Sequence, residues 1–111
     1  MKKLLAVLLL TLSGLVYAVP PTQTTTEYCT NLARFARYVT VVRDSNVDRL
    51  ALKKKVFASI DAGKAVNPQF TADDKIELGR IIDILYFRPN VTGDYAAQSY
   101  FQHCVEVNSE S

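Results

Sequence analysis

The sequence has few of the residues from which metal and nucleophile sites are built. Its 111 residues include two cysteines and one histidine. Their spacing does not match a metal site, and no glycine-rich segment has the pattern of a phosphate-binding loop. We expect the histidine, His103, to be an exposed side chain, and its neighbour Cys104 to be used in a disulfide. The sequence therefore predicts a protein that is not an enzyme and needs no cofactor, although a Ser–His–acid triad could still assemble in space.

The sequence also lacks an excess of charge of either sign. It has 13 basic and 11 acidic residues, and its formal net charge is +2. Lys2 and Lys3 belong to an expected signal peptide, and the remaining basic and acidic residues are equal in number. A nucleic-acid binder would show a basic excess or stripe, and a protein bound to an anionic membrane surface would show a basic cluster. We therefore expect neither nucleic acid nor a membrane surface as the partner.

The longest apolar run lies at the start of the chain and is short. Leu4–Leu12 has fewer residues than the roughly 20 of a membrane-spanning helix. With Val16 and Ala18 behind it, the run is typical of a signal peptide cleaved after Ala18, and Leu15 stands where a lipoprotein would need cysteine. We expect a bacterial protein, periplasmic or secreted, without a membrane anchor. The predicted organisation is a signal peptide over 1–18, a disordered lead-in over 19–26 and a domain over 27–108.

The two cysteines, Cys29 and Cys104, are expected to form a disulfide. Export to an oxidising compartment favours pairing, and two cysteines allow a single connectivity. The bond would join the first helix of the domain to the last one. On the chain-entropy model, closing so long a loop stabilises the fold by roughly 4 kcal/mol. The alternative is a pair of buried free thiols.

Apolar residues at helical spacing predict an all-α, four-helix domain. Threonine 25 or 26 is the expected cap of the first helix, and Ser45 or Asn46 that of the second. Thr71, paired with Asp74, and Thr92 are expected to cap the third and fourth helices, and Gly63 is expected to end the second. The predicted helices cover 27–43, 47–62, 71–88 and 93–107.

The segment 71–88 is apolar nearly all round, which is typical of a central helix. One face carries Leu78, Ile81, Ile82 and Leu85, and we expect it to be buried. Ile76, Ile84 and Phe87 lie on the other side, with Arg80 among them. That outer side is a candidate binding surface, but burial under the first or second helix is the favoured expectation. Gly79 inside this helix predicts close approach of another helix.

The preferred candidate binding surface lies on the first helix. Its outward positions carry Arg34, Arg37, Tyr38 and Val41, and arginine and tyrosine are enriched at the energetic centres of protein interfaces. We expect the first three to point away from the core and Arg34 to stack with Tyr38, four residues on. The alternative is an ordinary solvated face. A lysine triplet, Lys53–Lys55, is expected to be solvated, with its stems over apolar neighbours.

In its size, expected helicity and cysteine pair, the chain resembles two groups of small exported proteins. One group is the periplasmic acid-stress chaperones, and the other is the disulfide-bonded immunity proteins that neutralise toxins delivered by type VI secretion. Neither resemblance extends to a sequence motif, so it assigns no functional residue.

These observations favour a small exported, non-catalytic domain that binds another protein, and an immunity or inhibitor protein is one form of it. An acid-stress chaperone is the first alternative, because protonated carboxylates would expose its apolar helix faces. A small-ligand carrier and a small hydrolase are the others. A carrier would need an apolar cavity between its helices. The identity of the partner and the oligomeric state do not follow from the sequence.

Overall fold

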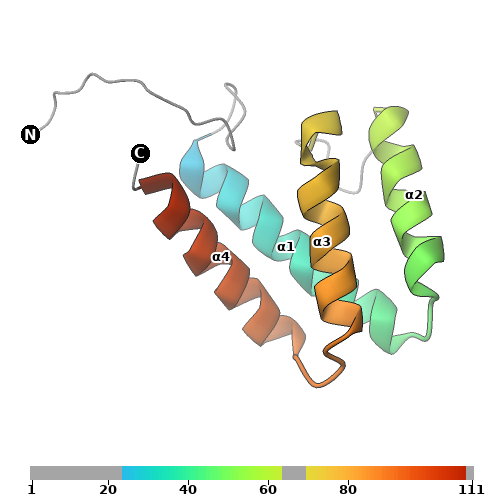
Figure 1. Cartoon of the computed structure of the whole chain (residues 1–111). Coiled ribbons are helices and arrows are strands. Elements are labelled where there is room, and N and C mark those ends of the chain that lie inside the picture. Colours follow the sequence, from blue (N-terminus) through green and yellow to red (C-terminus); the bar gives the residue numbers. More distant parts are fainter. Residues whose placement is uncertain (1–23, 64–69, 110–111) are drawn as a thin grey trace, which may run out of the picture.

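The computed structural model describes residues 24–63 and 70–109, and within them the chain forms four α-helices (Figure 1). The prediction of an all-α, four-helix domain is therefore confirmed. The expected signal peptide and most of the lead-in lie outside the described residues, as does the loop before Phe70. None of the described helices is both long and apolar enough to cross a membrane. The elements are α1 (Thr25–Asp44), α2 (Arg49–Asp61), the 3-10 turn η2 (Ala72–Asp74), α3 (Lys75–Tyr86) and α4 (Gly93–Ser109).

Short-range polar contacts set the helix ends. α1 begins at Thr25, two residues before the predicted start, and Thr24 caps it: the Thr24 Oγ1 accepts the Glu27 N–H at 3.0 Å, and the Thr24 N–H donates to Glu27 Oε1 at 2.9 Å. This reciprocal pair satisfies two otherwise unpaired donors. Asp48 caps α2 by accepting the Ala51 N–H at 3.1 Å. The predictions of a cap at 25 or 26 and at 45 or 46 were therefore wrong, because a better placed acceptor lies nearby in each case.

Two of the three remaining end signals act where the sequence predicts them. Thr92 caps α4, with its Oγ1 accepting the Tyr95 N–H at 3.1 Å. Asp74 Oδ2 accepts the Thr71 N–H at 2.8 Å, but this pair precedes and closes η2, and α3 itself begins only at Lys75, so Thr71 does not cap α3 directly as predicted. Gly63 follows the end of α2 with a φ of +71°, a conformation that glycine adopts without strain.

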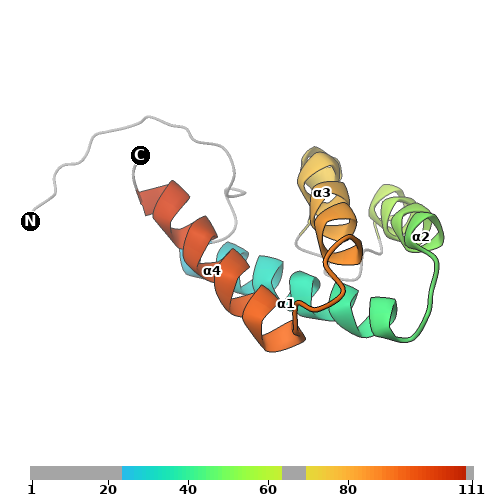
Figure 2. The same cartoon turned by 60° about the horizontal axis from the view of Figure 1, so that its bottom comes forward.

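The helices form two pairs, α1 with α4 and α2 with α3, and the contact between α1 and α3 joins the two pairs. α4 lies alongside α1, and α2 lies alongside α3, in both views (Figures 1 and 2). α1 contacts both α4 and α3, and α3 contacts both α1 and α2, so the central position expected for 71–88 is shared by α1 and α3. The buried core residues are Tyr28, Cys29, Leu32, Phe35, Ala36 and Val39 of α1, Leu52, Val56 and Ile60 of α2, Phe70, Leu78, Ile81, Ile82 and Leu85 in and before α3, and Ala96 and Cys104 of α4.

A disulfide joins Cys29 to Cys104, as the sequence predicts. It connects the beginning of α1 with the end of α4 across 75 residues of sequence, and the two Cα atoms are 5.6 Å apart. Cys29 is completely buried. Its burial follows from the position of α1 between its neighbours.

Candidate functional site

The described residues offer little for catalysis. Within residues 24–63 and 70–109, no group of three His, Cys, Asp or Glu side chains is placed to hold a metal ion. His103 is exposed on α4, as expected from the sequence. Cys104 is bonded to Cys29 and is not available as a nucleophile.

The four residues of the surface predicted on α1 do not form one free surface, because some of them contact neighbouring residues. Arg34 and Val41 are exposed, Val41 by 59%. Arg37 reaches across to α4 and forms an ion pair with Asp94. Tyr38 is half-buried, with its ring centroid 6.3 Å from that of Phe35. The expectation that Tyr38 points away from the core was wrong, because a central helix is covered over a wide arc.

A second surface lies on the outer side of α3, where the favoured expectation was burial. Ile76 is 78% exposed, Phe87 73% and Ile84 37%. α2 does not cover them because it packs against another side of α3, where Gly79 lies. A Cβ atom at Gly79 would come within 3.2 Å of the Phe57 ring of α2. The predicted close approach at Gly79 is thus confirmed, and it is the reason why the outer side of α3 stays open.

The end of α2 nearest to Phe87 extends this exposed side. Leu50 is 59% exposed, and its neighbour Arg49 places its guanidinium carbon 5.4 Å from the centre of the Phe87 ring. A cation over an aromatic face is attracted by the ring quadrupole. We call Arg49, Leu50, Ile84, Phe87 and Arg88 the α2–α3 surface.

Asp83 anchors Arg49 in this position. Its carboxylate accepts from Arg49 at 2.6 Å and from Lys53 at 2.9 Å, so one acid of α3 binds two cations of α2. The pKa of Asp83 is lowered, chiefly by the hydrogen bond from Lys53 and further by Arg49, although partial burial opposes the shift. The carboxylate is therefore ionised at neutral pH, and the α2–α3 surface keeps the positive charge of Arg88 in addition.

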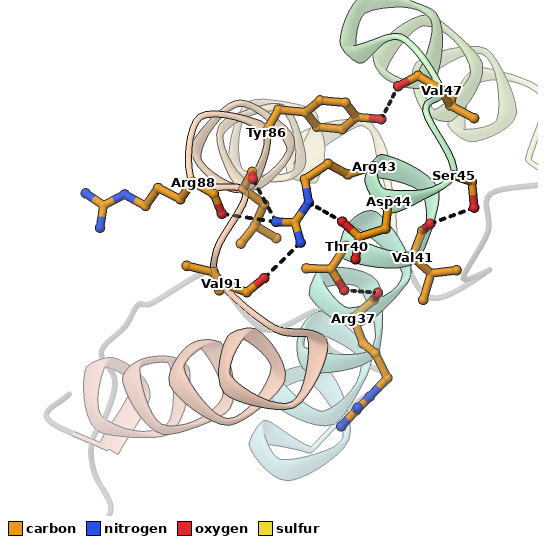
Figure 3. A network of polar contacts seen from close by, with 11 residues as sticks. Arg37, Thr40, Val41, Arg43, Asp44, Ser45, Val47, Tyr86, Arg88 and Val91 are labelled. Atoms are coloured by element: carbon orange, nitrogen blue, oxygen red, sulfur yellow. Dashed lines mark hydrogen bonds and ion pairs between the residues drawn. The ribbon is translucent and has the colours of Figure 1, made fainter.

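Arg43 holds the backbone behind this surface (Figure 3). Its guanidinium donates to the carbonyl oxygens of Leu85 at 3.0 Å, Arg88 at 3.1 Å and Val91 at 2.9 Å. The Arg43 side chain is 7% exposed. The Leu85 and Arg88 carbonyls also accept the backbone N–H groups of Arg88 and Val91, so Arg43 adds a second donor to each and fixes the connection between α3 and α4 to α1.

Tyr86 fixes the α2 side of the same surface. Its hydroxyl donates to the Val47 carbonyl at 2.7 Å, just before α2 begins (Figure 3). Burial raises the pKa of Tyr86, and the charge of Asp48 raises it further. The phenol therefore keeps its proton and remains a donor. Together with Arg43, it makes the α2–α3 surface a preorganised one.

Sequence reasoning finds part of this site and misses the rest. The helical spacing of 71–88 places Ile84 and Phe87 on one side together, but it favours their burial. At Arg43 the sequence predicts only the end of a helix and a turn, because the nearest of its three acceptors lies 42 residues further on. Nothing local in the sequence pairs Arg49 with Phe87. Both contacts depend on which helices become neighbours.

Comparison with known proteins assigns no family to this chain. No family model matches it, and neither a curated protein nor a solved structure was found to match. The function has to be inferred from the contacts and charges of the described residues.

Proposed function

We propose that this protein is a non-catalytic domain that binds another protein through the α2–α3 surface. The observation that carries the proposal is the exposure of two large apolar side chains, Phe87 by 73% and Leu50 by 59%, with the Arg49 guanidinium over the Phe87 ring. Grouped apolar side chains with an arginine are typical of the centre of an interface. The disulfide supports export to an oxidising compartment, where such a domain would meet its partner.

The way the surface is built favours binding with little reorganisation. Arg43 and Tyr86 hold the backbone on both sides of Phe87, and the Arg49–Asp83 ion pair holds the arginine over the ring. Side chains that are already ordered lose less conformational entropy on binding. The partner would therefore meet a surface close to its bound form.

Charge indicates what the partner surface contains. The carboxylate of Asp83 is neutralised by Arg49 and Lys53, while Arg88 is exposed. A partner with an apolar patch bordered by carboxylates would complement this surface. One form of this proposal is an inhibitor or immunity protein, whose target would carry such an acidic site.

A comparison of three variants tests the proposal. Phe87→Ser with Leu50→Ser removes the apolar part of the surface, and Tyr95→Ser is the matched control, because Tyr95 is 64% exposed on α4. Arg34→Ala with Val41→Ser removes the surface predicted on α1. Each tagged protein is expressed in its native cells, crosslinked and purified, and the recovered partner is quantified.

We expect the α2–α3 variant to lose at least about tenfold in recovered partner, as hot-spot removal does. Tyr95→Ser should keep full recovery. Melting temperatures check that all variants are folded, since exposed positions usually change stability by within about 0.5 kcal/mol. Full recovery with the α2–α3 variant would contradict the proposal, and a loss confined to the α1 variant would transfer the site to α1.

An acid-stress chaperone is the second candidate, and the position of Asp83 favours it. A single carboxylate binds two cations of α2, so protonation in acid would remove both contacts at once. Partly released α2 would expose its own buried apolar side chains, among them Val56. Binding of an apolar dye near pH 2–3, roughly the range of acid-expanded states, distinguishes this candidate, because the protein-binding domain needs no such transition.

A further inference from the structure

A groove with no role assigned so far is lined by residues of α1, of η2 and α3, and of α4, and Figure 2 shows α3 and α4 standing over α1. Its volume is about 260 Å³. Tyr28 and Leu32 form the floor, Glu77 belongs to the α3 wall, and Tyr100 and His103 belong to the α4 wall. The groove lies on the opposite side of α3 from α2. It is therefore separate from the α2–α3 surface, and binding in it is independent of the proposed function.

Buried aromatic and apolar groups shape this groove. The Tyr28 hydroxyl donates to Asp74 Oδ1 at 3.0 Å, and Asp74 Oδ2 accepts the Thr71 N–H. Asp74 is thus fully used in holding the floor to the α3 wall. Leu32 and Val107 add apolar surface at the floor and at the far end. A ligand would therefore meet a preformed site with aromatic and aliphatic walls.

The charge of the groove is negative. Asp73 and Glu77 line it in addition to Asp74. Glu77 is 3.7 Å from Arg80, whose side chain is 62% exposed, so this pair is loose. Burial raises the pKa of Tyr100, and Glu77 raises it further; burial and Asp74 likewise raise the pKa of Tyr28. Both phenols stay neutral and therefore add no charge of their own to the groove.

We propose that this groove binds the basic side chain of a polypeptide partner, a lysine or an arginine. Its aliphatic stem would lie against Leu32, Val107 and the Tyr100 ring, and its cationic head would reach Glu77 and Asp73. Carboxylates attract the head directly, and a neighbouring aromatic face adds a cation–π contribution. At about 260 Å³ the groove is smaller than the sites of drug-sized ligands, which favours one side chain as the occupant.

Titration by two-dimensional amide NMR tests this site with three small probes. Nα-acetyl-lysine amide carries the proposed group, and Nα-acetyl-norleucine amide has a similar stem without charge. Butylamine tests whether a free amine suffices. We expect saturable shifts of the amides of Glu77, Tyr100 and His103 with the lysine probe, and at least tenfold weaker binding of the norleucine probe. Equal binding of the two would overturn the proposal, and butylamine binding as tightly as the lysine probe would reject a polypeptide source.

A pair of matched variants locates the effect. Asp73→Asn with Glu77→Gln removes two carboxylates of the groove and should weaken lysine-probe binding at least tenfold. Asp44→Asn with Asp94→Asn removes the same number of charges at the opposite ends of α1 and α4 and should leave binding within twofold. Dispersed amide spectra confirm that both variants are folded. Equal losses in the two variants would show a general effect of net charge and would overturn the site.

Discussion

The α1–α4 pair and the α2–α3 pair are held together by different forces. α1 and α4 approach closely, because Ala33, Ala36, Ala96 and Ala97 are all buried between or beside them. At Gly93, a Cβ atom would come within 2.9 Å of Thr40 Oγ1. The disulfide then joins the two helices covalently.

α2 contributes Leu52, Val56 and Ile60 to the common core, and polar side chains also bridge α2 and α3. Asp83 binds Arg49 and Lys53, and Lys75 pairs with Asp61. The Lys75 ammonium also lies 5.7 Å from the centre of the Phe57 ring, and that ring packs on Gly79. Such partly exposed ion pairs contribute little each. The comparison shows a covalently closed frame, α1–α4, and a more weakly attached helix, α2, each with its own candidate binding surface.

The largest effect should come from opening the closed pair. Replacing both cysteines, Cys29→Ala with Cys104→Ala, removes a bond across 75 residues without leaving a free thiol. We expect the free energy of unfolding to fall by about 2–5 kcal/mol, mainly because the unfolded chain is no longer constrained. Urea denaturation followed by circular dichroism measures it. A loss below about 1 kcal/mol, well under the usual cost of removing a native disulfide, would show that packing alone holds α1 to α4.

A somewhat smaller loss of unfolding free energy is expected at Arg43, which joins α1 to the end of α3. Arg43→Met keeps the stem of the side chain and removes the donors for three carbonyl oxygens. Hydrogen bonds to a charged group contribute about 1.5–3 kcal/mol each, and their contributions do not simply add. We expect a loss of about 3 kcal/mol and faster exchange of the amide protons around Val91. Unchanged exchange there would mean that water replaces the guanidinium.

Features encoded within a few residues could be predicted from the sequence. The buried face of α3 follows from its spacing, the Thr92 cap and the Gly63 stop follow from residue type, and the disulfide follows from a count of two. The helix signals depend on a few neighbouring residues, and two cysteines can pair in only one way. For the same reason, the sequence predicts all four helices with errors of a few residues at their ends.

Features that depend on which helices become neighbours could not be predicted. An apolar stripe shows that a helix has a buried face, but it does not say what covers the opposite one. Ile84 and Phe87 are exposed because α2 packs on the Gly79 side of α3, and Tyr38 is half-buried because α1 is central. The groove between α3 and α4 has three separate elements in its walls and floor, so its carboxylates and phenols do not form a motif in the sequence.

Crowding the contact between α2 and α3 should weaken the second pair alone. Gly79→Val adds atoms where the Phe57 ring lies 3.2 Å from the position of a Cβ. Overpacking usually costs about 1–3 kcal/mol. Phe57→Leu in the same chain should recover part of the loss, because the shorter side chain makes room. The unfolding free energies of the wild type, the two single variants and the double variant form a double-mutant cycle. If the two single effects simply add in the double variant, then the steric conflict between positions 79 and 57 does not exist.

The smallest effect should be the loss of the ion pairs of Asp83, and its dependence on pH identifies it. The pKa of this carboxyl is lower in the folded protein than in the unfolded chain, where it is about 3.9. Its contribution is therefore present above about pH 4 and is lost as the pH falls through the folded-state pKa. Because the side chain is 36% exposed, Asp83→Asn should cost at most about 1 kcal/mol at pH 7.

This difference between the wild type and Asp83→Asn should shrink as the pH falls through the folded-state pKa of Asp83 and vanish below it, where both side chains are neutral. Asp44→Asn is the control, because the Asp44 side chain is 66% exposed and pairs with its neighbour Arg43 within α1. Urea denaturation at a series of pH values measures all three proteins. If the gap persists unchanged in acid, then Asp83 acts through packing, and α2 is attached to α3 by apolar contact rather than by charge. If the gap closes, α2 is the part of the molecule that acid loosens first, while the disulfide keeps α1 and α4 together.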